Sequence, residues 1–229
     1  MYWIIIIGFM FIGFLVQNRL RAKFQKYSQI SLHNGLSGRE IAEQMLHDHG
    51  IYDVQVISTP GQLTDHYNPK NKTVNLSDWV FDQRSVAAAA VAAHEVGHAV
   101  QHAKAYSWLS FRSAMVPIVS FSSRIMQYIF IAMLLGAFVV NMFPFEYVIY
   151  TMIALQATIT LFSVVTLPVE YDASNRALAW MQQKGITGHG EHAMAKDALN
   201  SAANTYVVGA LASITQLAYY LSFLGGGDD

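Results

Sequence analysis

The residues best suited to chemistry in this chain are His94, Glu95 and His98, which form a His-Glu-x-x-His motif. The motif follows Ser85 and four consecutive alanines, a composition that favours a helix. Residues four apart on a helix share a face, about 6 Å apart along the axis, so the two imidazoles can bind one zinc ion. Glu95 lies one position further round, where its carboxylate can take a proton from an activated water. The pattern predicts a zinc hydrolase; the alternative is two ordinary helix histidines that share a face by chance.

The composition indicates a membrane protein. Of 229 residues, 53% are hydrophobic and 13% are charged, whereas a typical soluble domain has roughly a quarter charged residues. The chain has no cysteine, which excludes thiolate zinc sites and disulfides. A net charge of −1 gives no support to a nucleic-acid surface. We therefore expect the lipid bilayer, and no nucleic acid, as a partner.

Several apolar segments are long enough to cross a bilayer. Residues 1–20 predict an uncleaved anchor, because basic residues follow the apolar run and none precedes it. The uncharged runs 125–143 and 147–167, joined by a turn at 141–146, predict a membrane hairpin. The apolar run 206–224 is either a fourth span or a helix packed at the membrane surface.

The distribution of basic residues predicts the orientation. All fourteen Lys and Arg residues lie outside residues 1–18 and 125–175. Cytoplasmic segments carry an excess of Lys and Arg, so both halves of the soluble part should face the cytoplasm. The expected location is the cell (inner or plasma) membrane, with several spans and the active site on the cytoplasmic side.

The remaining segments predict a small α+β core. Ser37-x-x-Glu40 is a capping box for a helix that stops at Gly50. A strand follows near residues 54–57, and the turn at 68–71 predicts a β-hairpin that could hold an extended peptide at its edge or be purely structural. The expected fold is thus a mainly α integral membrane protein with transmembrane helices and a small α+β metallopeptidase core. Its predicted segments are an anchor (1–20), a first half of the metallopeptidase domain with the motif helix (21–117), a transmembrane hairpin (118–168), a second half with the third ligand (169–205), and an apolar C-terminal helix with its tail (206–229).

A zinc peptidase needs a third protein ligand. His102 is eight residues from His94, about 12 Å along a helix, so it is more suited to supporting the ligands than to binding zinc. Glu146 is excluded because it lies in the turn across the membrane. The acids that remain are Glu170, Asp172, Glu191 and Asp197. Glu170 and Asp172 are favoured because the hairpin ends there. Glu170 lies at the very end of a span, where an acid without a role would be costly; the alternative is an acid that caps a helix beginning near Pro168.

Three segments together resemble the YugP-type membrane zinc metallopeptidases of bacteria, over nearly the whole chain. They are Leu63-Thr-Asp-His-Tyr67, His94-Glu-Val-Gly-His-Ala-Val-Gln-His102 and Glu170-Tyr-Asp-Ala-Ser-Asn-Arg-Ala-Leu178. The chain is more distantly similar to the HtpX and Ste24 gluzincins, which also insert a membrane hairpin between the motif helix and a ligand glutamate. Their second motif is Glu-x-x-Ala-Asp, and here a serine replaces the aspartate. The resemblance implies a gluzincin-like core with one Zn²⁺ ion on His94, His98 and Glu170.

Two supporting roles follow from the same motif. With serine at position 174, Asp172 or Asn175 is expected to orient an imidazole. Arg176 either binds a substrate carbonyl or oxyanion or simply flanks the membrane.

These features predict a membrane-bound zinc metalloendopeptidase with Glu95 as its catalytic residue, acting on membrane or membrane-proximal proteins or peptides. The alternative is a non-catalytic membrane adaptor with a structural zinc site, which would not need Glu95. Cleavage inside the bilayer is a further alternative, but the polar helix and hairpin before the motif favour an interfacial site.

Overall fold

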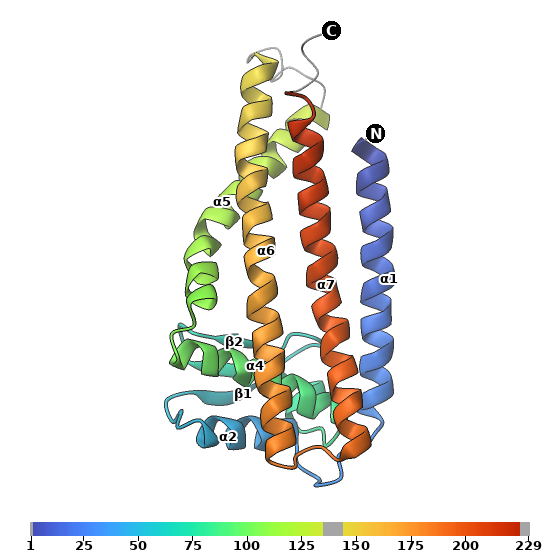
Figure 1. Ribbon diagram of the computed structural model, residues 1–229, viewed down its shortest axis with the longest axis vertical. Helices are drawn as coiled ribbons and strands as arrows, with labels where there is room; N and C mark the ends of the chain where they lie inside the picture. Colours follow the sequence, from blue (N-terminus) through green and yellow to red (C-terminus); the bar gives the residue numbers. More distant parts are fainter. Residues whose placement is uncertain (1, 135–143, 225–229) are drawn as a thin grey trace. The chain divides into compact units, whose positions relative to one another are not determined.

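The computed structural model describes residues 2–134 and 144–224, and these residues are mainly helical (Figure 1). The helices are α1 (Tyr2–Ser28), α2 (Gly38–Asp48), α3 (Asp78–Phe81), α4 (Val86–Ala103), α5 (Ser107–Leu134), α6 (Phe145–Gln183) and α7 (His189–Leu221). The strands are β1 (Gln55–Thr59), β2 (His66–Asn68) and β3 (Thr73–Ser77). Two compact units divide the chain. The helical unit comprises Met1–Phe14, Phe111–Leu167 and Tyr206–Asp229, and the mixed unit comprises Leu15–Ser110 and Pro168–Thr205.

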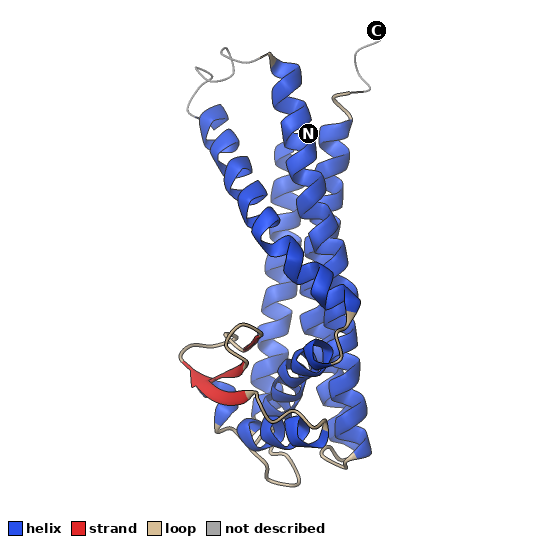
Figure 2. Ribbon diagram, turned by 90° about the vertical axis from the view of Figure 1, so that its left-hand side faces the viewer, coloured by secondary structure: helices blue, strands red, loops and turns tan. Residues whose placement is uncertain are grey.

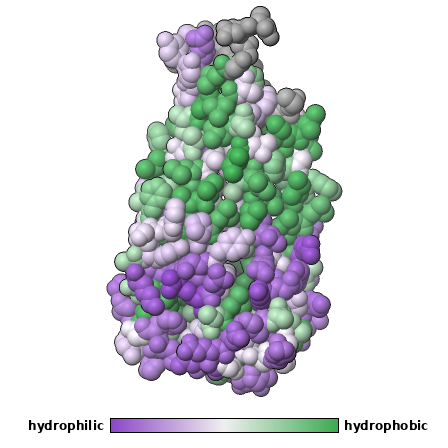
Figure 3. Space-filling model, in the orientation of Figure 1, coloured by the Kyte–Doolittle hydropathy of each residue, from purple (hydrophilic) through white to green (hydrophobic). Residues whose placement is uncertain are grey.

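Among the described residues, three helical segments are long and apolar enough to cross a membrane: Trp3–Ser28, Ser107–Met133 and Glu146–Gln183. Large apolar side chains such as Met10 and Tyr147 are more than 60% exposed. Figure 3 shows hydrophobic side chains gathered on the helical unit and hydrophilic ones on the mixed unit. Exposing so much apolar surface to water is energetically unfavourable, so these features fit association with a membrane. Helix α7 is not one of the three segments, so a fourth span stays a prediction.

Two predicted segment boundaries fall inside helices. The boundary between the transmembrane hairpin (118–168) and the second half of the metallopeptidase domain (169–205) falls inside α6, which continues through Pro168. The boundary between that second half and the apolar C-terminal helix (206–229) falls inside α7. Membrane helices tolerate proline because neighbouring groups can satisfy the freed carbonyl, so Pro168 is a weak stop signal. The turn predicted at 141–146 lies mostly outside the described residues, and α6 begins at Phe145.

The mixed unit contains a three-stranded sheet in the order β1-β3-β2; the strands are coloured red in Figure 2. The predicted hairpin is confirmed: β2 is antiparallel to β3, with Tyr67 opposite Val74. Strand β1 is parallel to β3, with Gln55 opposite Thr73. Strand β2 is therefore an edge strand of the sheet, and it contacts α4.

Helices α2 and α4 pack against each other in the mixed unit. The predicted capping box of α2 is confirmed, because Glu40 donates its N–H to Ser37 Oγ (3.3 Å) and Glu40 Oε2 accepts the N–H of Ser37 (2.7 Å). The apolar face of α2 is buried at Ile41 and Met45. Six alanines of α4 are buried in the same core, and their small side chains let other elements come close to the motif helix: Ala88, Ala89, Ala90, Ala92, Ala93 and Ala99.

Candidate metal centre

Helix α4 presents the two motif histidines on one face. It is capped by Ser85, whose Oγ accepts the N–H of Ala88 at 3.2 Å and satisfies one free donor of the first turn. The rings of His94 and His98, one turn apart, have centroids 4.8 Å apart. Both Nε2 atoms face the same carboxylate oxygen, Oε2 of Glu170, at 3.4 Å from His94 and 3.6 Å from His98.

Glu170 comes from α6 and is 4% exposed. The possible ligand atoms of His94, His98 and Glu170 all lie within 4.8 Å of one another. Zinc bonds of about 2.0–2.1 Å in a tetrahedron put neighbouring ligand atoms about 3.4 Å apart. The two measured distances therefore fit a carboxylate and two imidazoles around one ion, and the nitrogen and oxygen donors are those that zinc accepts.

Gly97 lets α6 approach α4 closely enough to deliver Glu170. A Cβ atom at Gly97 would lie 2.5 Å from the carbonyl oxygen of Ala173. Ala173 is three residues after Glu170, so the contact lies one helical turn from the third ligand. The glycine inside the motif thus sets the distance between the two helices at the site.

Ser174 orients the first histidine. Its Oγ lies 3.0 Å from Nδ1 of His94, which leaves Nε2 of that ring for a metal. The structure places this serine against the imidazole, where Asp172 or Asn175 was expected. Asn175 is exposed, and Asp172 reaches the site only through another side chain.

That side chain is Gln101, which the sequence reasoning missed. Gln101 is completely buried, and its Oε1 lies 3.0 Å from Nδ1 of His98. Its amide nitrogen donates to the carbonyl of Val169 (2.8 Å) and to Oδ2 of Asp172 (2.8 Å). Gln101 therefore links His98 to the turn of α6 that carries Glu170. Its position three residues after His98, on the same helix face, is the signal that could have identified it.

The carboxylate of Glu95 is 8% exposed and is held by strand β2. Its Oε2 accepts the backbone N–H of Tyr67 at 3.0 Å. Asp65, two residues earlier, accepts the N–H of Ser77 at 2.7 Å. Burial raises the pKa of Asp65, and the nearby negative charge of Glu95 raises it further. The N–H of Tyr67 on β2 thus fixes the carboxylate of Glu95, the residue next to His94.

The other predicted site residues lie outside the three-ligand group. His102 forms a hydrogen bond through Nδ1 with the hydroxyl of Tyr67 (2.8 Å), which connects it to the same strand as Glu95. Arg176 donates to Asp172 at 2.6 Å and 3.2 Å, and its guanidinium lies 5.7 Å from the ring centre of Tyr106. Asp172 of this ion pair also accepts a hydrogen bond from the side-chain amide of Gln101, so the ion pair helps to hold Gln101 in place.

The remaining candidate acids have other partners. Glu191 accepts the N–H of His33 at 2.8 Å, and Asp197 binds Lys23 (2.6 Å) and the hydroxyl of Tyr27 (2.7 Å). Both therefore act in joining helices and loops of the mixed unit. Of the four acids left open by the sequence, Glu170 is the one beside both histidines.

The charge balance of the site favours a cation. Burial lowers the pKa of His98, but the adjacent Glu170 carboxylate outweighs burial and leaves that pKa above its ordinary value. His98 and Glu170 together therefore attract a positive charge, which can be a proton or a metal ion. A metal ion must displace the proton before it can bind.

Two histidines and a glutamate around one point, with a second glutamate on the motif helix, define a candidate zinc hydrolase centre. The chain belongs to the family described as "Putative neutral zinc metallopeptidase", which matches residues 2–225. It is 36% identical over 220 residues to "Putative membrane protease YugP" of Bacillus subtilis (strain 168). The aligned residues cover 95% of this chain and 94% of that protein. No solved structure matches the chain significantly.

Proposed function

We propose that this protein is a membrane-anchored zinc endopeptidase with a gluzincin-like core, in which His94, His98 and Glu170 hold one zinc ion. The observation that carries the proposal is that Glu170 Oε2 lies 3.4 Å and 3.6 Å from the two Nε2 atoms, while the neighbouring Glu95 is held by the N–H of Tyr67. The family and the similar B. subtilis protein support a metallopeptidase associated with a membrane.

The residues of the site have distinct tasks in peptide hydrolysis. Zinc bound there would supply Lewis acidity for the attacking water and the scissile carbonyl. Glu95 takes the proton of that water and passes it to the leaving amine. Ser174 and Gln101 hold the two imidazoles through Nδ1, so that Nε2 stays directed at the centre.

Strand β2 offers a binding edge for an extended peptide. It is the edge strand of the sheet, and its residue Tyr67 already contacts Glu95. A substrate backbone that pairs with this edge would be brought to the acid by main-chain hydrogen bonds. The substrates we propose are proteins or peptides in or near the bilayer, reached from the cytoplasmic side because the Lys and Arg distribution favours that orientation.

The decisive experiment compares Glu95→Gln with Glu170→Ala in the purified full-length chain, with zinc content and cleavage of an unfolded substrate measured together. Glu95→Gln should keep zinc and lose cleavage, and Glu170→Ala should lose both. The control is Glu43→Gln, because Glu43 pairs with Arg39 on the exposed face of α2. If Glu95→Gln cleaves like the original chain, the proposed mechanism is wrong. Bound zinc without cleavage in the original chain would favour an adaptor with a structural zinc site.

The proposed orientation has its own test. A reporter fused at Pro144, just before α6, should be accessible only from outside the cell. A cytoplasmic signal from that position would overturn the proposed cytoplasmic active site.

A further inference from the structure

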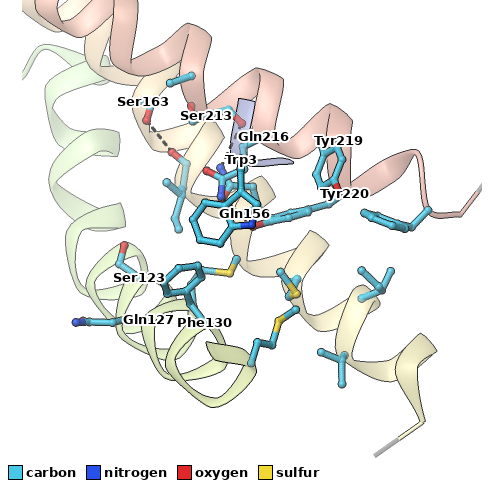
Figure 4. Close-up of a pocket in the computed structure, with 18 of the residues that line it drawn as sticks. Trp3, Ser123, Gln127, Phe130, Gln156, Ser163, Ser213, Gln216, Tyr219 and Tyr220 are labelled. Carbon is cyan, nitrogen blue, oxygen red and sulfur yellow. Dashed lines mark hydrogen bonds between the residues drawn. The ribbon is translucent and has the colours of Figure 1, made fainter. Parts of the chain in front are cut away.

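The helical unit contains a cavity of about 960 Å³, lined from α1, α5, α6 and α7 (Figure 4). Its volume is at the upper end of the roughly 300–1,000 Å³ that protein ligand sites occupy. Its lining residues belong to the helical unit, and the candidate zinc ligands belong to the mixed unit. The cavity is therefore a second candidate binding site.

The lining of the cavity is chemically suited to hydrocarbon. Methionine side chains are unbranched and flexible, so they adapt their shape to an apolar ligand. Three methionines and other large apolar side chains line the cavity, among them Met126, Phe130, Met133, Ile149, Met152 and Ile159.

Several polar groups in the lining already have protein partners. Gln156 donates to the carbonyl of Ser213 at 3.2 Å, and the hydroxyl of Ser163 donates to the carbonyl of Ile159 at 3.0 Å. The hydroxyl of Ser213 donates to the carbonyl of Ala210 at 2.9 Å. A buried water needs about two to four polar partners, so these groups offer little to a water cluster. An apolar ligand fits this lining better.

The cavity is elongated along the helices. Its lining runs from Val148 to Ser163 on α6 and from Gly209 to Phe223 on α7, about 22 Å and 21 Å at 1.5 Å per residue. That length covers much of the roughly 30 Å hydrocarbon core of a bilayer, and α1, α5 and α6 contain segments long and apolar enough to cross a membrane. Extended acyl chains therefore match both the length of the cavity and its surroundings, and a transmembrane helix is the rival occupant that the competition experiment tests.

We propose that this cavity binds the acyl chains of a bilayer phospholipid. Trp3 of α1 and Phe130 of α5 line the cavity and are 56% and 37% exposed, so at these two residues the cavity reaches the protein surface. Their rings meet edge to face at 6.2 Å, and Figure 4 shows Trp3 among Gln156, Gln216 and Phe130. A lipid chain enters between α1 and α5 by displacing this aromatic contact.

The chain offers matched variants for a test. Ala212 lines the cavity, so Ala212→Phe fills part of it. Gly209 also lines it, and a Cβ atom there would meet nothing within 4 Å, so Gly209→Phe enters the same space without a backbone clash. Ala157 of α6 is exposed and does not line the cavity, so Ala157→Phe is the control.

The experiment uses the full-length protein in vesicles of phosphatidylethanolamine and phosphatidylglycerol that contain a phosphatidylglycerol with a photoreactive diazirine on one acyl chain. After irradiation, mass spectrometry locates the labelled peptides. We expect label on the cavity segments of α5, α6 and α7, loss of that label in Ala212→Phe and Gly209→Phe, and its retention in Ala157→Phe. Glu95→Gln should label like the original chain, so this result is independent of peptidase activity.

Three outcomes would overturn the proposal: no label on the cavity segments of the original chain, unchanged label in a folded cavity-filling variant, or competition by a hydrophobic transmembrane peptide but not by unlabelled phospholipid. Retention of bound zinc shows that a variant is folded in the mixed unit, and monodisperse elution shows that it is not aggregated. The competition arm needs no variant, so it decides the question even where both phenylalanine variants misfold.

Discussion

The substitution Gly97→Ala tests whether the close approach of α4 and α6 builds the metal centre. The added Cβ atom would lie 2.5 Å from the oxygen and 3.0 Å from the carbonyl carbon of Ala173, whereas ordinary contacts begin at 3.4 Å. The backbone of α6 must therefore move by about 0.9 Å to restore an ordinary contact with the oxygen. Glu170, one turn away on the same helix, moves with it. Zinc–ligand distances tolerate only about 0.2 Å, so the third ligand is carried out of range.

The expected effects on zinc binding and on stability differ in size. We expect zinc affinity to fall roughly 10- to 100-fold, as when contacts that support metal ligands are lost. Overpacking costs about 1–3 kcal/mol, and replacing a helical glycine by alanine recovers about 1 kcal/mol. The free energy of unfolding without zinc should thus fall by only about 0–2 kcal/mol. Zinc affinity is the sharper measurement, made by titration against a competing chelator in detergent.

Two other glycines provide controls for this test. A Cβ atom at Gly190 in α7 meets nothing within 4 Å, so Gly190→Ala should leave zinc affinity unchanged. A Cβ atom at Gly38 would clash with the carbonyl of Val80, so Gly38→Ala should lower stability without weakening zinc binding in the folded fraction. If Gly97→Ala binds zinc like the original chain, the helix contact does not set the position of Glu170.

Three further predictions concern the supports of the site and its protons. Ser174→Ala should weaken zinc binding roughly 10-fold because His94 loses its partner, and Ser174→Asp should keep it; equal affinities for both variants would contradict the role of Ser174. Gln101→Leu leaves the Val169 carbonyl and Asp172 without this donor, so thermal unfolding should show a loss of about 1–3 kcal/mol together with weaker zinc binding; unchanged values would show that Gln101 does not hold His98. Zinc affinity, measured by equilibrium dialysis, should fall as the pH drops through the raised pKa of His98, from above about 6.5, because the proton displaces the metal. Affinity that stays constant down to pH 5 would refute this competition.

The sequence predicted the parts of the site that depend on position along one helix. The spacing of His94 and His98 requires only the period of an α-helix, and the structure confirms that both face one point. The hairpin of β2 and β3 was likewise evident from its turn residues. Local periodicity and turn chemistry were sufficient for these features.

The residues that were missed depend on how two helices pack. Ser174 and Gln101 are ordinary polar residues until α6 lies against α4, and then each meets an imidazole Nδ1. Periodicity alone did not select Glu170, because the register of α6 against α4 is a tertiary property; its place at the end of a span and the family resemblance did. The parallel pairing of β1 with β3 was also missed, since it joins strands that are not adjacent in the chain. Such contacts come from packing, which a single helix or strand does not encode.

The two motifs are better understood as two faces of one helix–helix contact. On α4, His94, Gly97 and His98 are followed by Gln101, the i, i+3, i+4 and i+7 pattern of one helix face. On α6, Glu170, Ala173 and Ser174 repeat the first three positions of that pattern. In each motif a small residue lies at the contact, and ligands and their supports flank it. The small residues set the distance between the backbones, and the flanking residues use that distance to bring three donors together and fix their orientation. A motif containing a glycine or alanine between its ligands therefore specifies how the helices approach as well as the chemistry of the site.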